Sequence, residues 1–89
     1  MKILIAEDDK TSFFMLESLL EKWGYTVLAV RDGDEAFKLL SGDEPPLLAI
    51  LDWMLPGMSG PEICSSLREG REGNGKPYQY IIILTVKEE

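Results

Sequence analysis

Three carboxylates stand where two apolar runs of the sequence end. Glu7 and Asp8 follow the run KILIA, and Asp52 lies near the end of the run LLAILDW. If these runs are neighbouring parallel strands, their carboxyl ends meet at one rim of a sheet and the three side chains converge there. Two like charges about 4 Å apart repel by roughly 4 kcal/mol at an effective dielectric constant of about 20. Such a cluster therefore requires a raised pKa or a bound cation.

The ligand chemistry of this cluster favours a hard cation. Carboxylate oxygens suit Mg²⁺ or Mn²⁺, and the absence of histidine disfavours zinc and copper. Mg²⁺ usually keeps water ligands and shares its shell with phosphate, so a phosphoryl group is the expected second component. Each acid taken alone is more simply interpreted as a solvated loop residue. Their joint position at two strand ends favours a site instead.

A hydroxyl group extends the pattern. Thr85, in the segment ILTVK, follows a third apolar run, YIIIL. A threonine at a strand end is more often a strand former or a cap. Beside an aspartate that carries phosphate, however, its Oγ is suited to donate a hydrogen bond to the added oxygens.

The segments that carry these residues alternate between strand and helix. Apolar and β-branched runs predict strands, and amphipathic segments between them predict helices. The strands are expected at residues 2–6, 25–30, 47–53 and 80–84, and the helices at 10–23, within 31–46, and after Ser59. Asp9 or Thr11 is expected to cap the first helix, and Ser59 the third. The residues expected on the inner helix faces are Phe13, Leu16, Leu20 and Trp23, with Met15 and Leu19 widening that stripe, then Ala36, Leu39 and Leu40, then Ile63, Cys64 and Leu67.

The strand runs are continuously apolar, which is typical of a parallel sheet covered by helices on both faces. With right-handed crossovers, the alternation predicts an α/β fold with a doubly wound parallel sheet in the flavodoxin-like strand order 2-1-3-4. The winding reverses between strands 1 and 3, and ligands of such folds bind beyond the carboxyl ends of the strands at that reversal. The three acids are expected at this position.

Length, composition and charge indicate one small domain. The 89 residues are 45% apolar and 28% charged, a balance typical of folded soluble proteins. The formal charge of −7 repels polyphosphate backbones, so direct nucleic-acid binding is not expected. No run is long enough for a membrane span and no signal peptide is recognisable, so we expect no membrane association and a cytoplasmic location. Cys64 is expected to be an inert core thiol.

The segments ILIAEDD, LDWMLPGMSG and IIILTVK, in this order and spacing, resemble the CheY-like receiver domain of two-component response regulators. The resemblance covers residues 1–89 as one domain. It implies a domain that accepts a phosphoryl group from a histidine kinase and then switches conformation, within a parent protein that carries an output domain. It also implies a signalling domain, with at most self-directed phosphotransfer, and not an enzyme.

The resemblance assigns a role to each site residue. Asp52 would be the phosphoacceptor, and Glu7, Asp8, Asp52 and the backbone carbonyl of Met54 would hold Mg²⁺, or Mn²⁺. Thr85 would be the switch hydroxyl, and the backbone N–H groups of Met54 and Val86 would contact the phosphoryl oxygens. Family members commonly carry a smaller residue at position 86, so we expect phosphate access or lifetime to differ here.

The resemblance also implies a C-terminal truncation, because receivers continue with a fifth strand and last helices. The family lysine on the loop after that strand contacts the phosphoryl group and has no counterpart within these residues, whereas the implied Mg²⁺ ligands are all present. Lys87 is a conceivable substitute, although a solvated loop lysine is the usual case. The fourth strand would form an uncovered apolar edge, and Phe14 adds apolar surface to the first helix, so we expect self-association.

Two other function classes are alternatives to the phosphoacceptor domain. A receiver-like interaction or dimerisation module that cannot be phosphorylated gains from the missing lysine and loses from the intact acid cluster. A Mg²⁺-dependent phosphatase of the haloacid dehalogenase type would need a second aspartate two residues after Asp52, where this chain has Met54. The phosphatase is therefore disfavoured.

Overall fold

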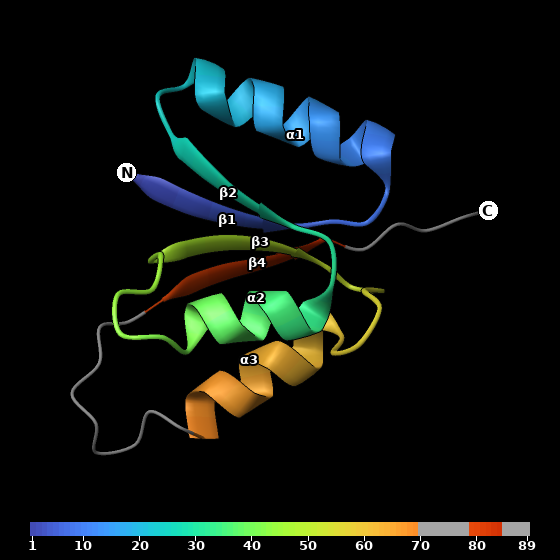
Figure 1. Cartoon of the computed structure of the whole chain (residues 1–89), viewed down its shortest axis with the longest axis vertical. Coiled ribbons are helices and arrows are strands. Elements are labelled where there is room, and N and C mark those ends of the chain that lie inside the picture. The colour runs from blue at the N-terminus through green and yellow to red at the C-terminus, as the bar shows by residue number, and fades with distance from the viewer. Residues whose placement is uncertain (70–78, 85–89) are drawn as a thin grey trace.

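A computed structural model describes residues 1–69 and 79–84, which form a parallel sheet with helices on both faces (Figure 1). The elements in chain order are β1 (Lys2–Ala6), α1 (Lys10–Lys22), β2 (Thr26–Val30), α2 (Gly33–Leu40), β3 (Leu48–Asp52), α3 (Gly60–Glu69) and β4 (Tyr80–Leu84). The described strands are arranged in the order β2-β1-β3-β4, and every neighbouring pair is parallel. The predicted doubly wound order 2-1-3-4 is confirmed.

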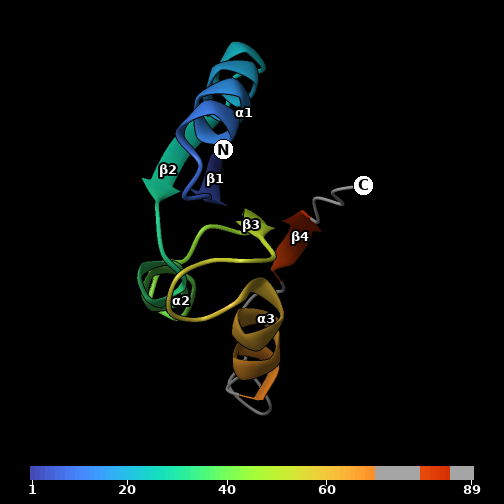
Figure 2. The ribbon, with the colours of Figure 1, turned by 90° about the vertical axis from the view of Figure 1, so that its right-hand side faces the viewer.

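The sheet separates two apolar cores. Helix α1 covers one face, and helices α2 and α3 lie side by side on the other (Figure 2). Successive strand residues alternate between the faces, so Leu4 packs on the α2–α3 side while Ile3 and Ile5 pack on the α1 side. The central strands β1 and β3 are thus buried on both faces, as their continuous apolar runs predict.

Side-chain caps fix where the helices begin. The Asp9 carboxylate accepts a hydrogen bond from the Ser12 amide at 2.8 Å and caps α1. Of the two predicted caps, Asp9 and Thr11, the structure therefore has Asp9. At α3, the predicted cap Ser59 accepts a hydrogen bond from the Glu62 amide at 3.3 Å, and the Glu62 carboxylate accepts one from the Ser59 amide at 3.1 Å. This reciprocal pair is a capping box, and it determines where the chain that leaves β3 becomes helical.

Four predictions for the inner helix faces are wrong. Met15 and Leu19 were expected to widen the inner stripe of α1 but are 66% and 44% exposed, because the sheet covers only the narrower stripe of Phe13, Leu16 and Leu20. Leu39 was expected inside but is 41% exposed, because Ala36 and Leu40 face the sheet and Phe37 packs beside them. Trp23 was expected on the inner stripe of α1, but it caps the C-terminus of the helix and is 64% exposed. Cys64 is half-buried, and this burial raises the pKa of its thiol, which suits the expected unreactive role.

Strand β4 is the outer strand of the described sheet. Its side chains are only partly buried, and Ile82 is 56% exposed despite lying in an apolar run. None of the helices in the described ranges combines the length and the hydropathy needed to cross a lipid bilayer.

Candidate functional site

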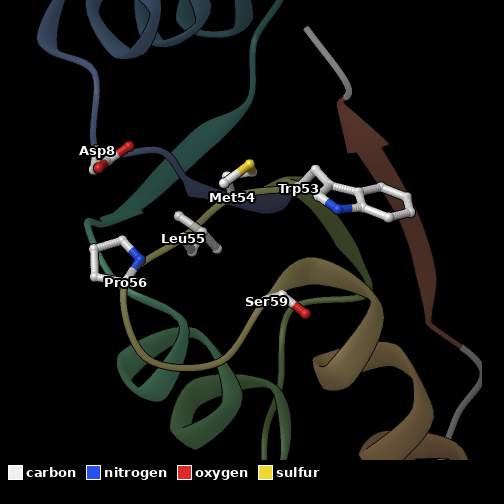
Figure 3. Close-up of a pocket in the computed structure, with 6 residues that line it drawn as sticks. All are labelled: Asp8, Trp53, Met54, Leu55, Pro56 and Ser59. Carbon is white, nitrogen blue, oxygen red and sulfur yellow. The ribbon is translucent and has the colours of Figure 1, made fainter.

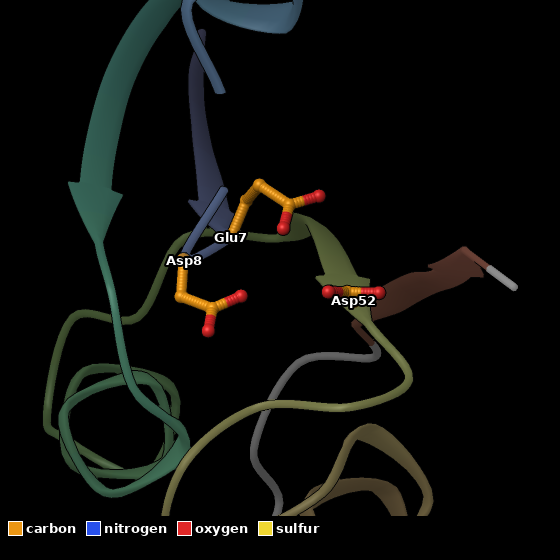
Figure 4. Close-up of side chains that lie close together, drawn as sticks. All are labelled: Glu7, Asp8 and Asp52. Atoms are coloured by element: carbon orange, nitrogen blue, oxygen red, sulfur yellow. The ribbon is translucent and has the colours of Figure 1, made fainter. Parts of the chain in front are cut away.

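Glu7, Asp8 and Asp52 converge at the carboxyl ends of neighbouring strands (Figure 4). One carboxylate oxygen from each residue lies within 4.8 Å of the other two. The first two residues directly follow β1, and Asp52 is the last residue of β3. The predicted meeting of these three acids at the reversal of winding is therefore observed.

Strand register explains why the acids meet. Ala6 of β1 pairs with Leu51 of β3, so Glu7 and Asp52 are the next residues along the two chains. The alternation of side chains then places Glu7 and Asp52 on the same side of the sheet plane, as a continuation of the row formed by Ile5 and Ile50. Asp8 comes one residue later, where the chain has left the strand and is turning toward α1.

The electrostatics of the cluster are unfavourable without a partner ion. The Glu7 side chain is only 6% exposed, and this burial is the main cause that raises its pKa. The Asp9 amide donates a hydrogen bond to the Glu7 carboxylate at 3.1 Å and lowers the pKa, whereas a hydrogen bond with Asp52 and the charges of Asp52 and Asp8 raise it further. A proton or a cation would relieve this repulsion.

The cluster has the donor set and accessibility that Mg²⁺ requires. Its ligand atoms are all carboxylate oxygens, which are hard donors. Glu7 is buried, Asp52 is half-buried and Asp8 is exposed, so the cluster opens to water on one side. An ion bound here could keep several water ligands, as Mg²⁺ usually does in proteins.

The loop between β3 and α3 forms the wall of a shallow pocket beside the acids (Figure 3). This pocket has a volume of about 320 Å³, and its lining residues are Asp8, Trp53, Met54, Leu55, Pro56 and Ser59. The loop is anchored at both ends, because the Trp53 amide donates to the Leu84 carbonyl at 2.9 Å and the Gly60 amide donates to the Trp53 carbonyl at 3.3 Å. Leu55 is buried in the core between these ends, and Met54 is exposed.

The remaining predicted site residues, Thr85, Val86 and Lys87, lie outside the described residues. In sequence they follow Leu84, the β4 residue that pairs with Asp52. Sequence reasoning missed two residues, one beside the site and one at the opposite ends of the strands. Gly33 contacts the loop after Asp52, although its sequence signal was only that of a turn glycine before a helix. Gln79 directly precedes β4 and is buried at the amino ends of the strands, although the polar, glycine-rich segment before it predicts only a surface loop.

Comparison with known proteins identifies relatives over nearly the whole chain. Residues 3–89 match the family model of the response regulator receiver domain. The alkaline phosphatase synthesis transcriptional regulatory protein PhoP of Bacillus subtilis is 38% identical over 88 residues, and the phosphate regulon transcriptional regulatory protein PhoB of Rhizobium meliloti is 43% identical over 88 residues. Both alignments cover 99% of this chain but only 34% and 37% of the respective relatives.

Solved structures agree with the sequence relatives. The response regulator protein TrrA of Thermotoga maritima, solved in complex with Mg²⁺ and BeF, superposes with a TM-score of 0.77 and is 31% identical. The match covers 98% of this chain and 70% of that structure. This chain spans about a third of the length of the curated relatives PhoP and PhoB. It belongs to the response regulator receiver domain family of two-component signalling.

Proposed function

We propose that this domain accepts a phosphoryl group from a histidine kinase on the carboxylate of Asp52, with Mg²⁺ held by Glu7, Asp8, Asp52 and the backbone carbonyl of Met54. The observation that carries this proposal is the convergence of three carboxylate oxygens within 4.8 Å at the carboxyl ends of β1 and β3. Ligand sites of doubly wound sheets concentrate at this reversal of winding.

The chemistry assigned to Asp52 needs no activating base. The carboxylate oxygen is itself the nucleophile, and it attacks phosphorus while the phosphorus–nitrogen bond to the kinase histidine breaks. The product is an acyl phosphate on Asp52, and the electron pair of the broken bond stays with the histidine nitrogen. Bound Mg²⁺ would neutralise the charge that develops on the transferring phosphoryl oxygens. The exposed side of the pocket, beside Asp8 and Met54, leaves room for the donor.

Two further assignments complete the proposal. Thr85 is the switch hydroxyl, and the backbone N–H groups of Met54 and Val86 bind phosphoryl oxygens. Thr85 and Val86 directly follow the β4 residue that pairs with Asp52.

The parent protein carries an output domain and acts in the cytoplasm. Support for an output domain comes from the relatives PhoP and PhoB, which are named transcriptional regulatory proteins and are about three times as long as the matched region.

A small phosphodonor tests the acceptor role directly. Incubation with phosphoramidate and Mg²⁺ should add the mass of one phosphoryl group to the protein, and the D52N variant should remain unmodified. The D43N variant, which changes an exposed loop acid away from the cluster, is the matched control and should be modified like the wild type. A folded protein that binds Mg²⁺ but acquires no phosphoryl group would exclude the acceptor function.

The alternative is an interaction module that works by self-association and is not phosphorylated. Its support is the apolar surface of β4 and α1, where Ile82 is 56% exposed and Phe14 is 68% exposed. Beside β4, a pocket of about 290 Å³ opens on the α1 face of the sheet and is lined almost wholly by apolar side chains. An apolar outer strand of this kind pairs readily with a second copy of the chain.

Sedimentation velocity over a range of concentrations tests this alternative. Self-association should increase with concentration in the wild type, and the I82K variant should shift the protein toward the monomer because a charge on an edge strand opposes pairing. The T26K variant places the same charge on β2, the other outer strand of the described sheet, and is the control. A wild-type protein that stays monomeric at high concentration would exclude the alternative.

A further inference from the structure

The amino end of α2 lies directly against the loop that follows Asp52. The Gly33 amide donates a hydrogen bond to the Pro56 carbonyl at 2.9 Å. The two segments approach so closely that a methyl group on Gly33 would overlap the carbonyl group of Met58. This contact joins backbone to backbone, so neither side can avoid it by rotating a side chain.

A second contact holds the same loop one residue further on. Gly57 has a φ of +79°, a conformation that residues with a side chain rarely adopt. A Cβ built on Gly57 would lie only 2.5 Å from Oδ2 of Asp34, so the first turn of α2 also packs against the loop at this point. Gly33 and Asp34 together contact three consecutive loop residues, 56–58.

These contacts complete the support of the loop around Met54. The Trp53 amide of the loop donates a hydrogen bond to the Leu84 carbonyl, and the Leu55 side chain is buried in the core. The Pro56 carbonyl accepts a hydrogen bond from α2. Met54 is the exposed residue between these supports. Its backbone position therefore depends on the supports on both sides and not on packing of its own side chain.

We infer that Gly33 is a positioning residue for the metal site, because its contacts with Pro56 and Met58 set the position of the Met54 carbonyl. This inference rests on the proposed function, in which that carbonyl is a Mg²⁺ ligand. Mg²⁺ demands near-ideal octahedral geometry, so a displaced ligand weakens binding even when the carboxylates stay in place. Residues that orient metal ligands from outside the coordination shell typically change metal affinity by about 10–100-fold.

The G33A variant tests the inference when Mg²⁺ alone is titrated and binding is measured by calorimetry. A side chain at this position forces the loop away from α2, so we expect Mg²⁺ affinity about 10-fold lower than in the wild type. Two glycine controls should retain wild-type affinity. A Cβ on Gly42 would meet its nearest neighbours at an ordinary 3.6 Å, and Gly24 has a φ of +93° with no atom within 4 Å, so G24A strains the backbone far from the loop.

The controls separate three outcomes. Equal affinity of G33A and the wild type would overturn the inference and leave the proposed function intact. Absence of Mg²⁺ binding in the wild type would overturn both. Weaker binding by G24A to the same extent as G33A would also overturn the inference, because general destabilisation would then explain the loss.

Hydrogen exchange in the wild type provides a measurement that does not depend on the folding of G33A. If the contact and Mg²⁺ binding are coupled, linkage requires Mg²⁺ to strengthen the contact in return. Mg²⁺ should therefore slow exchange of the Gly33 amide more than exchange of the Ser41 amide, which donates to the Phe37 carbonyl at the other end of the same helix. Equal slowing of the two amides would overturn the inference.

Discussion

The carboxyl group of Glu7 is buried against that of Asp52, one residue beyond the register pair of Ala6 and Leu51. The same parallel pairing that buries the apolar residues of β1 and β3 thus forces two acids together at the strand ends. Their repulsion opposes folding, and whatever removes it stabilises the native state. Without a bound cation, the repulsion between these acids therefore lowers the stability of the domain.

Removing the charge of Glu7 should raise the stability of the metal-free domain and weaken its binding of Mg²⁺. The E7Q variant keeps an acceptor for the Asp9 amide, so without Mg²⁺ we expect its free energy of unfolding to rise by about 1 kcal/mol, the lower end of the range for like charges about 4 Å apart. Mg²⁺ at 100 times its Kd should stabilise the wild type by about 2.7 kcal/mol, and this gain should largely disappear in E7Q. Urea denaturation with and without Mg²⁺ measures both effects.

The E21Q variant is the control for this experiment, because Glu21 is an exposed acid on α1. It should behave like the wild type under both conditions. A metal-free E7Q that is less stable than the wild type would contradict the prediction and would indicate that the Glu7 carboxylate is a net stabilising group.

The raised pKa of Glu7 predicts a pH dependence with a definite sign. Because this pKa lies above the ordinary value of 4.5, the native state binds a proton at pH values where the unfolded chain does not. Without Mg²⁺, the stability of the wild type relative to E7Q should rise as the pH falls from neutral toward 4.5. Asp9 has the opposite sign, since its pKa is lowered from 3.8, but its effect appears at lower pH and cancels in the comparison.

Denaturation of both proteins across this pH range measures the difference. In the same range the Mg²⁺ affinity of the wild type should fall with pH, because the cation competes with the proton on Glu7. A difference in stability between the wild type and E7Q that does not change with pH would contradict the assignment of the raised pKa to Glu7.

The strand order and the acid cluster were predictable because each depends on a local signal and a general rule. Continuous apolar runs identify buried parallel strands, and the rule for doubly wound sheets places their carboxyl ends together. The exact register was not predictable, because no signal in the sequence shows which residue of β1 lies beside which residue of β3. Only the structure shows that Glu7 and Asp52 each lie one residue beyond the pair of Ala6 and Leu51.

The wrong and missed residues have a common cause. In a helix of eight residues, both Leu39 and Leu40 fit an apolar stripe, and only the contact with the sheet decides between them. Gly33 and Gln79 act through backbone groups of segments far away in the sequence. Such contacts leave no periodic pattern in the chain, so single-sequence reasoning has no means of detecting them.

Gln79 provides a test of a buried polar anchor. Its side-chain amide donates hydrogen bonds at 3.1 Å to the carbonyls of Leu40 and Pro46, and the residue is only 6% exposed. The Q79M variant keeps the size of the side chain and leaves those carbonyls without this donor, so we expect the free energy of unfolding to fall by about 1–3 kcal/mol. The S65A variant, at an exposed position of α3, should stay within about 0.5 kcal/mol of the wild type. A Q79M protein as stable as S65A would show that water replaces the amide.

The cap of α2 provides a last prediction, because it holds the helix end that contacts the loop after Asp52. The Asp32 carboxylate accepts a hydrogen bond from the Glu35 amide at 2.8 Å. The D32A variant removes this acceptor and should lower the free energy of unfolding by about 1 kcal/mol, whereas D32N keeps an acceptor oxygen and should lose much less. The urea midpoint should shift at a constant m-value, since a lost cap leaves the surface exposed on unfolding almost unchanged. Equal losses in D32A and D32N would show that the charge near the helix end, and not the hydrogen bond, carries the stabilisation.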